Sequence, residues 1–351
     1  MSCSGDSQKE QINLQQLKTQ LEKGVVPERE NPFRERAFKP YLGEQWIGEA
    51  VSYGCYREGQ APGVKGPSES EILEDLTLIS KYWNLIRVYG SDDDSERILR
   101  VIQEHQLPVK VMLGIWLENE DNSPERRRAN IRQVVRGIEL ARRFTEEIIA
   151  VNVGNESQVF WSAHRMNMQD LIRYIRAVRK FVRQPVTTAD DYNFWNKPES
   201  REVAREVDFI VTHMYPLWNG ITLPKAIAWT DSIYRVVANS HPAKTVVVGE
   251  IGWATNYNPE KKGPGEQGSL IKGEVNLKAQ EKFLIQLHKW IHKNRITTFL
   301  FEAFDEPWKG GGEQSGPKEI EKNWGVFYEN RTPKPSFKEF LRAVNKKEPE
   351  K

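Results

Sequence analysis

The chain is poor in cysteine and has no long apolar run. Only Cys3 and Cys55 occur among its 351 residues, so the disulfide framework that stabilises many small secreted domains is not expected. No segment approaches the roughly 20 consecutive apolar residues that a membrane-spanning helix needs. The first six residues, MSCSGD, contain no apolar core of a secretory signal. The sequence as written therefore predicts neither a transmembrane span nor a leader.

Cys3 nevertheless stands close to the start of the chain, ahead of a polar stretch. This placement makes it a candidate for the acylated residue of a lipoprotein whose leader has been removed. A stray thiol in a polar tail is the equally simple alternative. The compartment stays open, because secreted, periplasmic and lipid-anchored surface forms all agree with the sequence.

An excess of charge of one sign is also missing. Lysine and arginine number 51 and aspartate and glutamate 49, which gives a net charge of +2. This even balance does not indicate a nucleic-acid partner, and we interpret basic clusters such as residues 126–128 as solvated helix faces. With 38% hydrophobic and 28% charged residues, the composition is that of a globular protein.

What the sequence does contain is a regular alternation of strand-like and helix-like segments. Short β-branched apolar runs alternate with longer segments that begin at capping residues such as Ser68. No compositional break marks a second domain, and no glycine-rich phosphate loop follows an early strand. The pattern predicts an α/β protein with a single (β/α)8 TIM barrel over residues 41–351, preceded by an N-terminal extension over residues 1–40. The predicted strands cover residues 46–52, 85–89, 109–113, 148–153, 186–189, 209–213, 245–249 and 297–303.

Two of these strands lead directly into a glutamate. Residues 148–156 read IIAVNVGNE and residues 245–253 read TVVVGEIGW, so Glu156 and Glu250 follow buried parallel strands. In a barrel the carboxyl ends of all strands meet on one face. Two carboxyl groups on that face can flank a glycosidic bond, one protonated to release the leaving oxygen and one ionised to attack the anomeric carbon.

The alternation of strand side chains predicts which way these glutamates point. If the period of two continues to the strand tips, Glu250 shares a face with Val248, and Glu156 shares one with Gly154. Gly154 and Gly249 are then expected to remove bulk beside the carboxylates and to leave room for a sugar ring.

Polar and aromatic residues that follow the other strands are expected to line the same cleft. An ionised carboxylate needs hydrogen-bond donors, for which Arg87 and Tyr215 are the leading candidates. Asn155 is suited to donate to the 2-hydroxyl group of a sugar. The cleft shows no cysteine–histidine spacing typical of a metal site, so no metal and no organic cofactor are expected. The predicted substrate-binding residues are Tyr53, Arg87, Tyr89, Asn155, Asp191, Tyr192, Tyr215, Trp253, Glu302, Glu306, Trp308 and Lys309.

These segments resemble glycoside hydrolase family 17, the β-1,3-glucanases of the large (β/α)8 retaining clan. The resemblance extends over about residues 45–310 in the expected order. VGNE and VGEIGW together are specific for this family, whereas either motif alone is weak evidence for it. The matching segments are VGNE at 153–156, VGEIGW at 248–253, FEAFDEPWK at 301–309 and, more weakly, YG at 53–54 and IRVY at 86–89.

The resemblance implies roles for individual residues. Glu156 would be the acid/base and Glu250 the nucleophile, while Glu306 and Lys309 match an additional pair at the rim of the family's site. Tyr215 would correspond to the aromatic residue after the sixth strand that orients the nucleophile in the wider clan.

Two motifs of this chain differ from those of the plant enzymes of the family. DEPW at 305–308 replaces the usual NENQ, and HMYP at 213–216 also differs. The chain looks more like the bacterial branch of the family, whose members include transferases that join glucan chains.

The sequence therefore predicts a retaining enzyme that cleaves β-1,3-glucosidic bonds in laminarin-type glucan, with a β-glucan polysaccharide or oligosaccharide as its partner. Retention requires the two carboxyl groups to lie roughly 5–5.5 Å apart. A β-1,3-glucanosyltransferase using the same two glutamates is the main alternative. An enzyme of the same clan acting on β-1,4-glucan or mannan, and a non-catalytic glucan-binding barrel, are the others.

Overall fold

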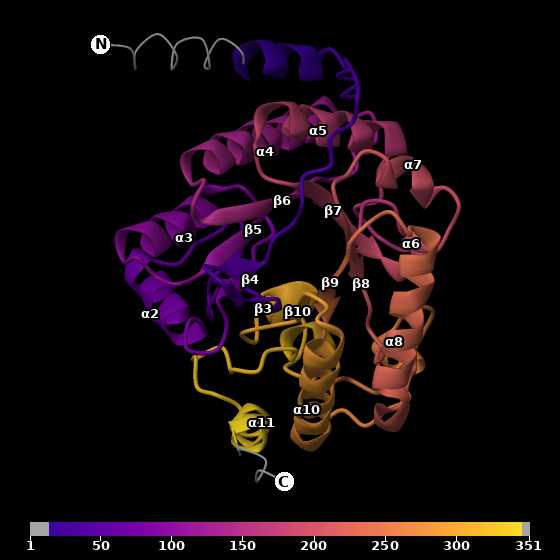
Figure 1. The fold of residues 1–351 in the computed structure, drawn as a ribbon. Helices are drawn as coiled ribbons and strands as arrows, with labels where there is room; N and C mark the ends of the chain where they lie inside the picture. The colour runs from indigo at the N-terminus through magenta and orange to yellow at the C-terminus, as the bar shows by residue number, and fades with distance from the viewer. Residues whose placement is uncertain (1–13, 346–351) are drawn as a thin grey trace.

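The computed structural model describes residues 14–345 and forms a closed barrel of eight parallel strands surrounded by helices (Figure 1). The strand order is β10-β3-β4-β5-β6-β7-β8-β9, so each strand lies beside its neighbour in the sequence and the last closes on the first. The predicted (β/α)8 TIM barrel is confirmed. The barrel strands are β3 (Glu49–Ser52), β4 (Leu85–Arg87), β5 (Lys110–Ile115), β6 (Ile148–Asn155), β7 (Val186–Asp191), β8 (Ile210–His213), β9 (Val246–Ile251) and β10 (Thr298–Leu300).

The strands form because their apolar residues are buried on both faces, as parallel sheets require. One cluster takes at least one residue from each strand, including Ala50, Met112 and Val247, and fills the barrel interior. A larger cluster lies between the strands and the helices, and Val246 and Val248 belong to it. The interior is therefore a packed core, and the site must lie at one end of it.

The helices begin at the capping residues that the sequence indicates. Ser68 forms a full capping box with Glu71, and Asp92, Ser123, Asn167 and Asn276 each accept a backbone hydrogen bond in the first turn of the following helix. The longer helices are α2 (Glu69–Ile79), α3 (Asp93–Glu104), α4 (Pro124–Arg143), α5 (Met168–Phe181), α8 (Leu223–Ser240), α10 (Leu277–Asn294) and α11 (Pro335–Asn345). Short turns are α6 (Tyr192–Trp195), α7 (Ser200–Ala204), α9 (Gln267–Leu270), η1 (Lys309–Gln314) and η2 (Ile320–Lys322).

The first predicted strand, residues 46–52, is in fact two elements. Trp46 belongs to a small antiparallel hairpin of β1 (Tyr41–Leu42) and β2 (Gln45–Trp46), and the barrel strand starts only at Glu49. Gly43, at a φ of 59°, permits the tight turn of the hairpin. A side chain at Gly48 would collide with the Trp46 ring, so glycine allows the chain to bend between the two strands.

The part of the N-terminal extension that the structure describes packs against the barrel. Residues 14–22 are helical, and Leu17 and Leu21 are buried against the core. Further on, the backbone N–H of Arg36 donates to Asp208 at 2.7 Å, and Phe38 stacks on Phe209 at the base of the barrel. Cys3 lies outside the described residues. Within residues 14–345, no helix is long and apolar enough to cross a membrane.

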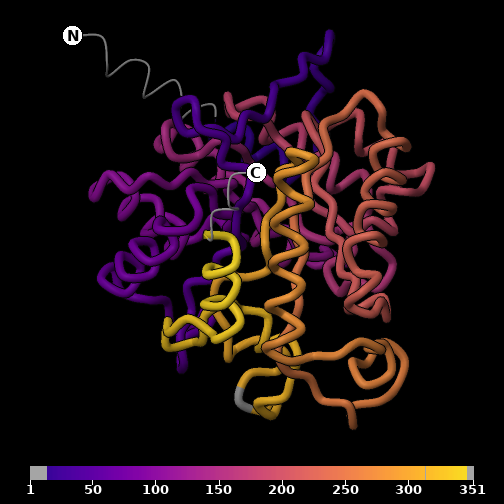
Figure 2. The backbone as a smooth tube through the Cα atoms, turned by 60° about the horizontal axis from the view of Figure 1, so that its bottom comes forward, coloured from indigo at the N-terminus to yellow at the C-terminus, as the bar shows by residue number. Residues whose placement is uncertain are grey.

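Two long loops at the carboxyl end of the barrel are joined to each other. One loop follows β9 and contains α9, and the other follows β10 and contains η1 and η2 (Figure 2). Gln267 Nε2 donates to Glu319 Oε1 at 2.6 Å, and Lys261 pairs with the same carboxylate at 3.3 Å. These contacts hold the two loops together beside the end of the barrel at which the strands terminate.

Candidate active site

Glu250, at the tip of β9, is enclosed by hydrogen-bond donors. Its Oε1 accepts from Arg87 Nη1 at 2.8 Å and from the hydroxyl of Tyr89 at 3.0 Å, and its Oε2 accepts from the hydroxyl of Tyr215 at 2.6 Å. Arg87 reaches it from β4 across the barrel mouth and is itself fully buried. Four of the residues that the sequence assigns to the site thus meet at one carboxylate.

These donors favour the ionised form of Glu250. Burial alone would raise the pKa of this carboxyl, but the electrostatic influence of His213 and Arg87 and the hydrogen bonds from Tyr215 and Tyr89 outweigh it. The pKa of Glu250 is therefore held below its usual range. A buried carboxylate that remains charged at neutral pH is suited to act as a nucleophile.

Glu156, just past β6, lies opposite Glu250 and is joined to it through His213. Nδ1 of His213 lies 3.0 Å from Oε1 of Glu156, and Nε2 lies 3.1 Å from Nη1 of Arg87. A carboxylate only accepts, so Nδ1 of His213 donates to Glu156. One carboxylate oxygen of Glu156 lies within 4.8 Å of one of Glu250.

The two glutamates differ in access to solvent. The side chain of Glu156 is 26% exposed and that of Glu250 is 7% exposed. Glu156 can therefore exchange a proton with water or with an incoming hydroxyl group, whereas Glu250 is closed off except toward the cleft.

Glu250 faces the cleft because of a bulge in β9, and the expected alternation was wrong there. Thr212 pairs with Val248 but His213 pairs with Glu250, so Gly249 is an extra residue in β9. Val248 faces the helices, and the extra residue turns Glu250 inward. A Cβ on Gly249 would lie 2.3 Å from a methyl carbon of Val211. The glycine therefore makes room for β8 and not for a sugar.

A second bulge lies in β6 next to Glu156. Asn152 pairs with Thr187 and Asn155 with Ala189, which leaves one extra residue in β6. Gly154 has a φ of 80°, a conformation that other residues rarely adopt. As a result, Asn155 also faces the site, where its Oδ1 accepts from Arg87 Nη2 at 2.6 Å.

A second charged cluster follows β10. The ammonium group of Lys309 lies 2.7 Å from Glu302 Oε2 and 2.5 Å from Glu306 Oε2, and the indole N–H of Trp308 donates to Glu306. Burial raises the pKa of Glu302 well above its usual range. Burial also acts on Glu306, but the charge of Lys309 and three hydrogen bonds outweigh it and lower its pKa. The pKa values of the two carboxyls are therefore shifted in opposite directions.

Two predicted substrate-binding residues, Tyr53 and Trp253, are buried away from the cleft, and two others, Asp191 and Tyr192, make contacts of their own. Tyr53 is buried and its hydroxyl donates to Asp75 beneath α2. Trp253 is 1% exposed, packs on Phe283 and donates to a backbone carbonyl, so its ring is not available to a sugar in this structure. Asp191 caps α6 and Tyr192 donates to Asn219. Burial raises the pKa of Asp191 to about 8, and the negative charges of Glu156 and Glu250 add to the effect, so its carboxyl also lies near the two glutamates.

The sequence reasoning missed several residues of this face. Desolvation raises the pKa of Glu321 to about 7, and the negative charges of Glu156 and Glu250 add to the effect, so its carboxyl lies near the two glutamates. Phe160 and Trp161, shortly after Glu156, are 74% and 47% exposed and form an edge-to-face pair. This aromatic pair in the loop after β6 was visible in the sequence as FW, but nothing marked it as exposed.

The arrangement also bears on metal binding. Glu156, His213 and Glu250 each offer a ligand atom within 4.8 Å of the others. Arg87, however, already contacts two of these atoms, the Oε1 of Glu250 and the Nε2 of His213. The guanidinium thus takes the place that a cation would occupy.

Comparisons with known proteins identify a family for this chain. A model of the BtgE/BtgC glycoside hydrolase domain matches residues 50–325. The btgC protein of Aspergillus niger is 27% identical over 290 residues, which is 78% of this chain and 40% of that protein. Glucan endo-1,3-beta-glucosidase btgC of Emericella nidulans is 26% identical over 288 residues, 77% of this chain and 42% of that protein. The chain thus spans about two fifths of the length of these curated relatives.

Two solved structures share the fold. An endo-laminarinase from Formosa Hel1_33_131 superposes with a TM-score of 0.72 at 21% identity, covering 85% of this chain and 88% of that one. A glycoside hydrolase family 17 β-1,3-glucanosyltransferase from Rhizomucor miehei superposes with a TM-score of 0.65 at 22% identity, covering 82% and 95%. At these identities the likeness establishes the barrel fold.

Proposed function

The chain belongs to the BtgE/BtgC glycoside hydrolase domain family, and from that premise we propose that it cleaves β-1,3-glucosidic bonds in β-1,3-glucan with retention of configuration. The observation that carries this proposal is the pair of glutamates, Glu156 and Glu250, whose oxygens approach within 4.8 Å across the barrel mouth. Oxygens this close agree with the short separation, roughly 5–5.5 Å, of the carboxyl groups in retaining enzymes and are closer than the roughly 6.5–9.5 Å of inverting ones.

In the first step, Glu250 attacks the anomeric carbon while Glu156 protonates the departing glycosidic oxygen. The low pKa of Glu250 keeps the attacking oxygen ionised, and Tyr215 and Tyr89 fix its direction. In the second step, Glu156 removes a proton from an incoming hydroxyl group, which attacks the covalent glucosyl-enzyme and releases Glu250. Water as the acceptor gives hydrolysis.

The β-1,3 linkage is the part of the proposal that depends on relatives. The Emericella nidulans relative is named a glucan endo-1,3-beta-glucosidase, and the Formosa structure is named an endo-laminarinase. The motifs around Glu156, Glu250 and Lys309 support placing the chain with glycoside hydrolase family 17. The bacterial branch of that family stays a prediction.

The remaining polar groups of the cleft suit the hydroxyl groups of a glucose ring. The contact from Arg87 holds the carbonyl oxygen of Asn155, which leaves the amide NH2 to donate to the 2-hydroxyl. The Lys309, Glu306 and Trp308 cluster supplies a charged and aromatic rim. Each of these contacts orients the sugar over Glu250, where orientation raises the rate of attack.

The alternative function is transfer of the glucosyl group to a second glucan chain, and one structural feature favours it. The exposed rings of Phe160 and Trp161 follow the acid/base Glu156 along the chain and offer apolar surface on which an acceptor sugar can stack. The Rhizomucor miehei structure with the same fold is named a β-1,3-glucanosyltransferase. An acceptor held there would compete with water for the glucosyl-enzyme.

Product sizing tests the proposal. The chain is incubated with laminarin and defined laminari-oligosaccharides, with cellulosic and mannan substrates in parallel. We expect shortened products from the β-1,3 substrates alone; products longer than the starting oligosaccharide would identify transfer. Cleavage restricted to the β-1,4 substrates, or no turnover of any of them, would contradict the assignment.

Tyr215→Phe tests how Glu250 is kept ionised. The hydroxyl donates to Glu250 at 2.6 Å and lowers its pKa, so its removal raises that pKa. Because only ionised Glu250 attacks, the acidic limb of the kcat/KM–pH profile should move to higher pH. We also expect kcat/KM near neutrality to fall about 10- to 100-fold, as for a lost hydrogen bond to a charged group.

Tyr82→Phe is the matched control, because Tyr82 is 38% exposed and packs against Trp83 and Phe337 away from the cleft. Its profile should coincide with that of the unchanged protein. An acidic limb that stays in place in Tyr215→Phe would show that Tyr215 does not set the charge of Glu250.

A further inference from the structure

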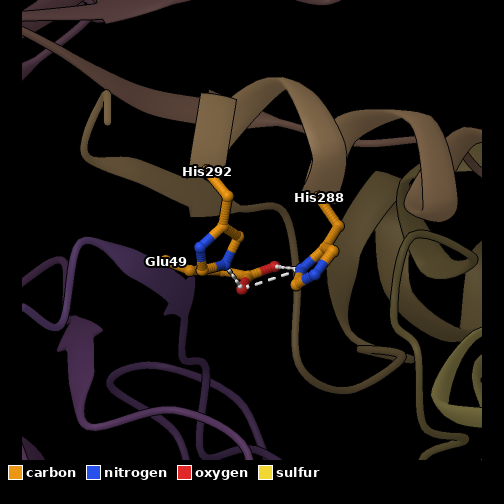
Figure 3. A group of neighbouring side chains, drawn as sticks. All are labelled: Glu49, His288 and His292. Atoms are coloured by element: carbon orange, nitrogen blue, oxygen red, sulfur yellow. Dashed lines mark hydrogen bonds and ion pairs between the residues drawn. The ribbon is translucent and has the colours of Figure 1, made fainter. Parts of the chain in front are cut away.

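A second group of ligand-bearing side chains lies at the opposite end of the barrel from the glutamates. Glu49 is the first residue of β3, and His288 and His292 lie one turn apart on α10 (Figure 3). Nδ1 of His288 is 2.9 Å from Glu49 Oε1, and Nε2 of His292 is 2.8 Å from Glu49 Oε2. One ligand atom from each of the three lies within 4.8 Å of the others.

We propose that Glu49, His288 and His292 bind a divalent transition-metal ion, with Zn²⁺ as the best-suited ion, at the base of the barrel. Two imidazoles and one carboxylate are a ligand set that zinc uses with water in the fourth position. Histidines four residues apart on one helix face lie on the same side and converge on one point. The inference does not depend on the proposed glucanase activity.

The distances fit such an ion after a small adjustment. Tetrahedral ligands about 2.0–2.1 Å from zinc are about 3.3 Å from each other. The nitrogens of His288 and His292 now lie 2.8–3.0 Å from the carboxylate oxygens, as hydrogen-bonded atoms do. Outward movement of a few tenths of an ångström would open the space for the metal.

Neighbouring aromatic rings already orient the two imidazoles. His288 makes an edge contact with Phe340 of α11, and His292 makes one with Trp46 of the β1–β2 hairpin. Both histidines are partly exposed, with 27% and 50% of their side-chain surfaces accessible, so an ion can enter from solvent. Preorganised rings reduce the loss of side-chain entropy on binding.

Metal binding replaces protons in this group. In the metal-free protein, the nitrogens of His288 and His292 that face Glu49 carry hydrogens and donate them to the carboxylate. The ion must displace these protons, and binding should therefore weaken as the pH falls.

The ion would connect the first and last parts of the barrel. Glu49 pairs in register with Thr298 of β10, and α10 is the helix that leads into β10. A metal bound between β3 and α10 would therefore reinforce the seam at which the ring of strands closes. Because it binds only the folded chain, it should raise the temperature of unfolding.

The test uses the full chain without a polyhistidine tag, stripped with a chelator and titrated with ZnSO4 by calorimetry. We expect one equivalent of Zn²⁺ with low-micromolar or tighter affinity, a higher melting temperature, and the visible absorption of tetrahedral Co²⁺ when CoCl2 replaces zinc. Glu49→Gln and His292→Ala should each weaken zinc binding by at least about tenfold, because even indirect partners of a metal contribute this much.

His105→Ala is the matched control, since His105 is exposed at the end of α3 and should leave the affinity unchanged. Glu49→Gln retains the shape of the side chain, so it keeps the test valid if His292→Ala is unstable. Absence of zinc binding by the unchanged chain would overturn the proposal. Binding that persists in Glu49→Gln, or that is lost in His213→Ala instead, would place the ion elsewhere and also overturn it.

Discussion

Glu250→Gln is expected to reduce kcat/KM on β-1,3-glucan by about 10⁴-fold or more, in the range found when a covalent nucleophile is removed. The amide keeps the shape of the side chain, its oxygen can still accept from Arg87, and its NH2 group can donate to the hydroxyl of Tyr215, so the barrel should fold normally. It carries no negative charge and cannot form the glucosyl-enzyme. Initial rates on laminarin, with circular dichroism to verify folding, provide the measurement.

Chemical rescue separates the loss of a nucleophile from the loss of a binding contact. In Glu250→Ala, added azide fits the space of the missing carboxylate and should give a glucosyl azide of inverted, α configuration. Glu125→Gln is the control, because Glu125 is a 76% exposed residue of α4 and should retain full activity. Activity of Glu250→Gln within tenfold of the unchanged protein would remove Glu250 from the nucleophilic role.

Glu156→Ala should have the next largest effect, and its size should depend on the leaving group. We expect kcat on laminarin to fall about 10²- to 10⁴-fold, as when a general acid is lost. An aryl glucoside with an acidic phenol needs little protonation, so its first step should continue and the glucosyl-enzyme should accumulate. A burst of released phenol followed by slow turnover is the expected time course.

Azide should accelerate the second step in Glu156→Ala and give a glucosyl azide of retained, β configuration, since Glu250 still forms the intermediate. Together with the α product of Glu250→Ala, this result would distinguish the two glutamates by stereochemistry. An equal loss of rate on laminarin and on aryl glucosides would mean that Glu156 does not protonate the leaving group.

The barrel was predictable because its evidence is local and repeated. Buried parallel strands need continuous apolar runs, as at 148–153, and most of the longer helices begin at a residue that caps their first turn, as Ser68 does for α2. The strand-like runs recur eight times, with helix-like segments between them. The β1–β2 hairpin escaped prediction because Gln45–Trp46 is only two residues long and continues into a true strand after Gly48.

The face on which Glu250 lies could not be predicted from alternation. A bulge depends on how β9 pairs with β8, and only the close approach of Val211 explains why position 249 is glycine. The same limit applies to Trp253, which follows the strand tip in sequence but turns into the core against Phe283. Pairing and packing between distant segments decide such details, and a single sequence does not display them.

The sequence indicated which chemical groups lie in the candidate site but not how they are hydrogen-bonded to one another. Arg87 and Tyr215 were expected to donate to a carboxylate and Tyr89 to bind substrate, and the structure brings all three to Glu250. The position of His213 between the two glutamates depends on the closure of the ring and emerges only in three dimensions. The spacing of His288 and His292 was visible, whereas their partner Glu49 lies 239 residues away.

The stereochemistry of the first product tests the central claim most directly, namely that two facing carboxyl groups act in succession on one sugar. Laminari-oligosaccharide is mixed with the chain, and the anomeric protons of the released reducing end are followed by NMR before mutarotation proceeds. Two displacements predict that the β anomer appears first and the α anomer grows in slowly. Initial formation of the α anomer would mean a single displacement by water, and would contradict the assignment of Glu250 as nucleophile.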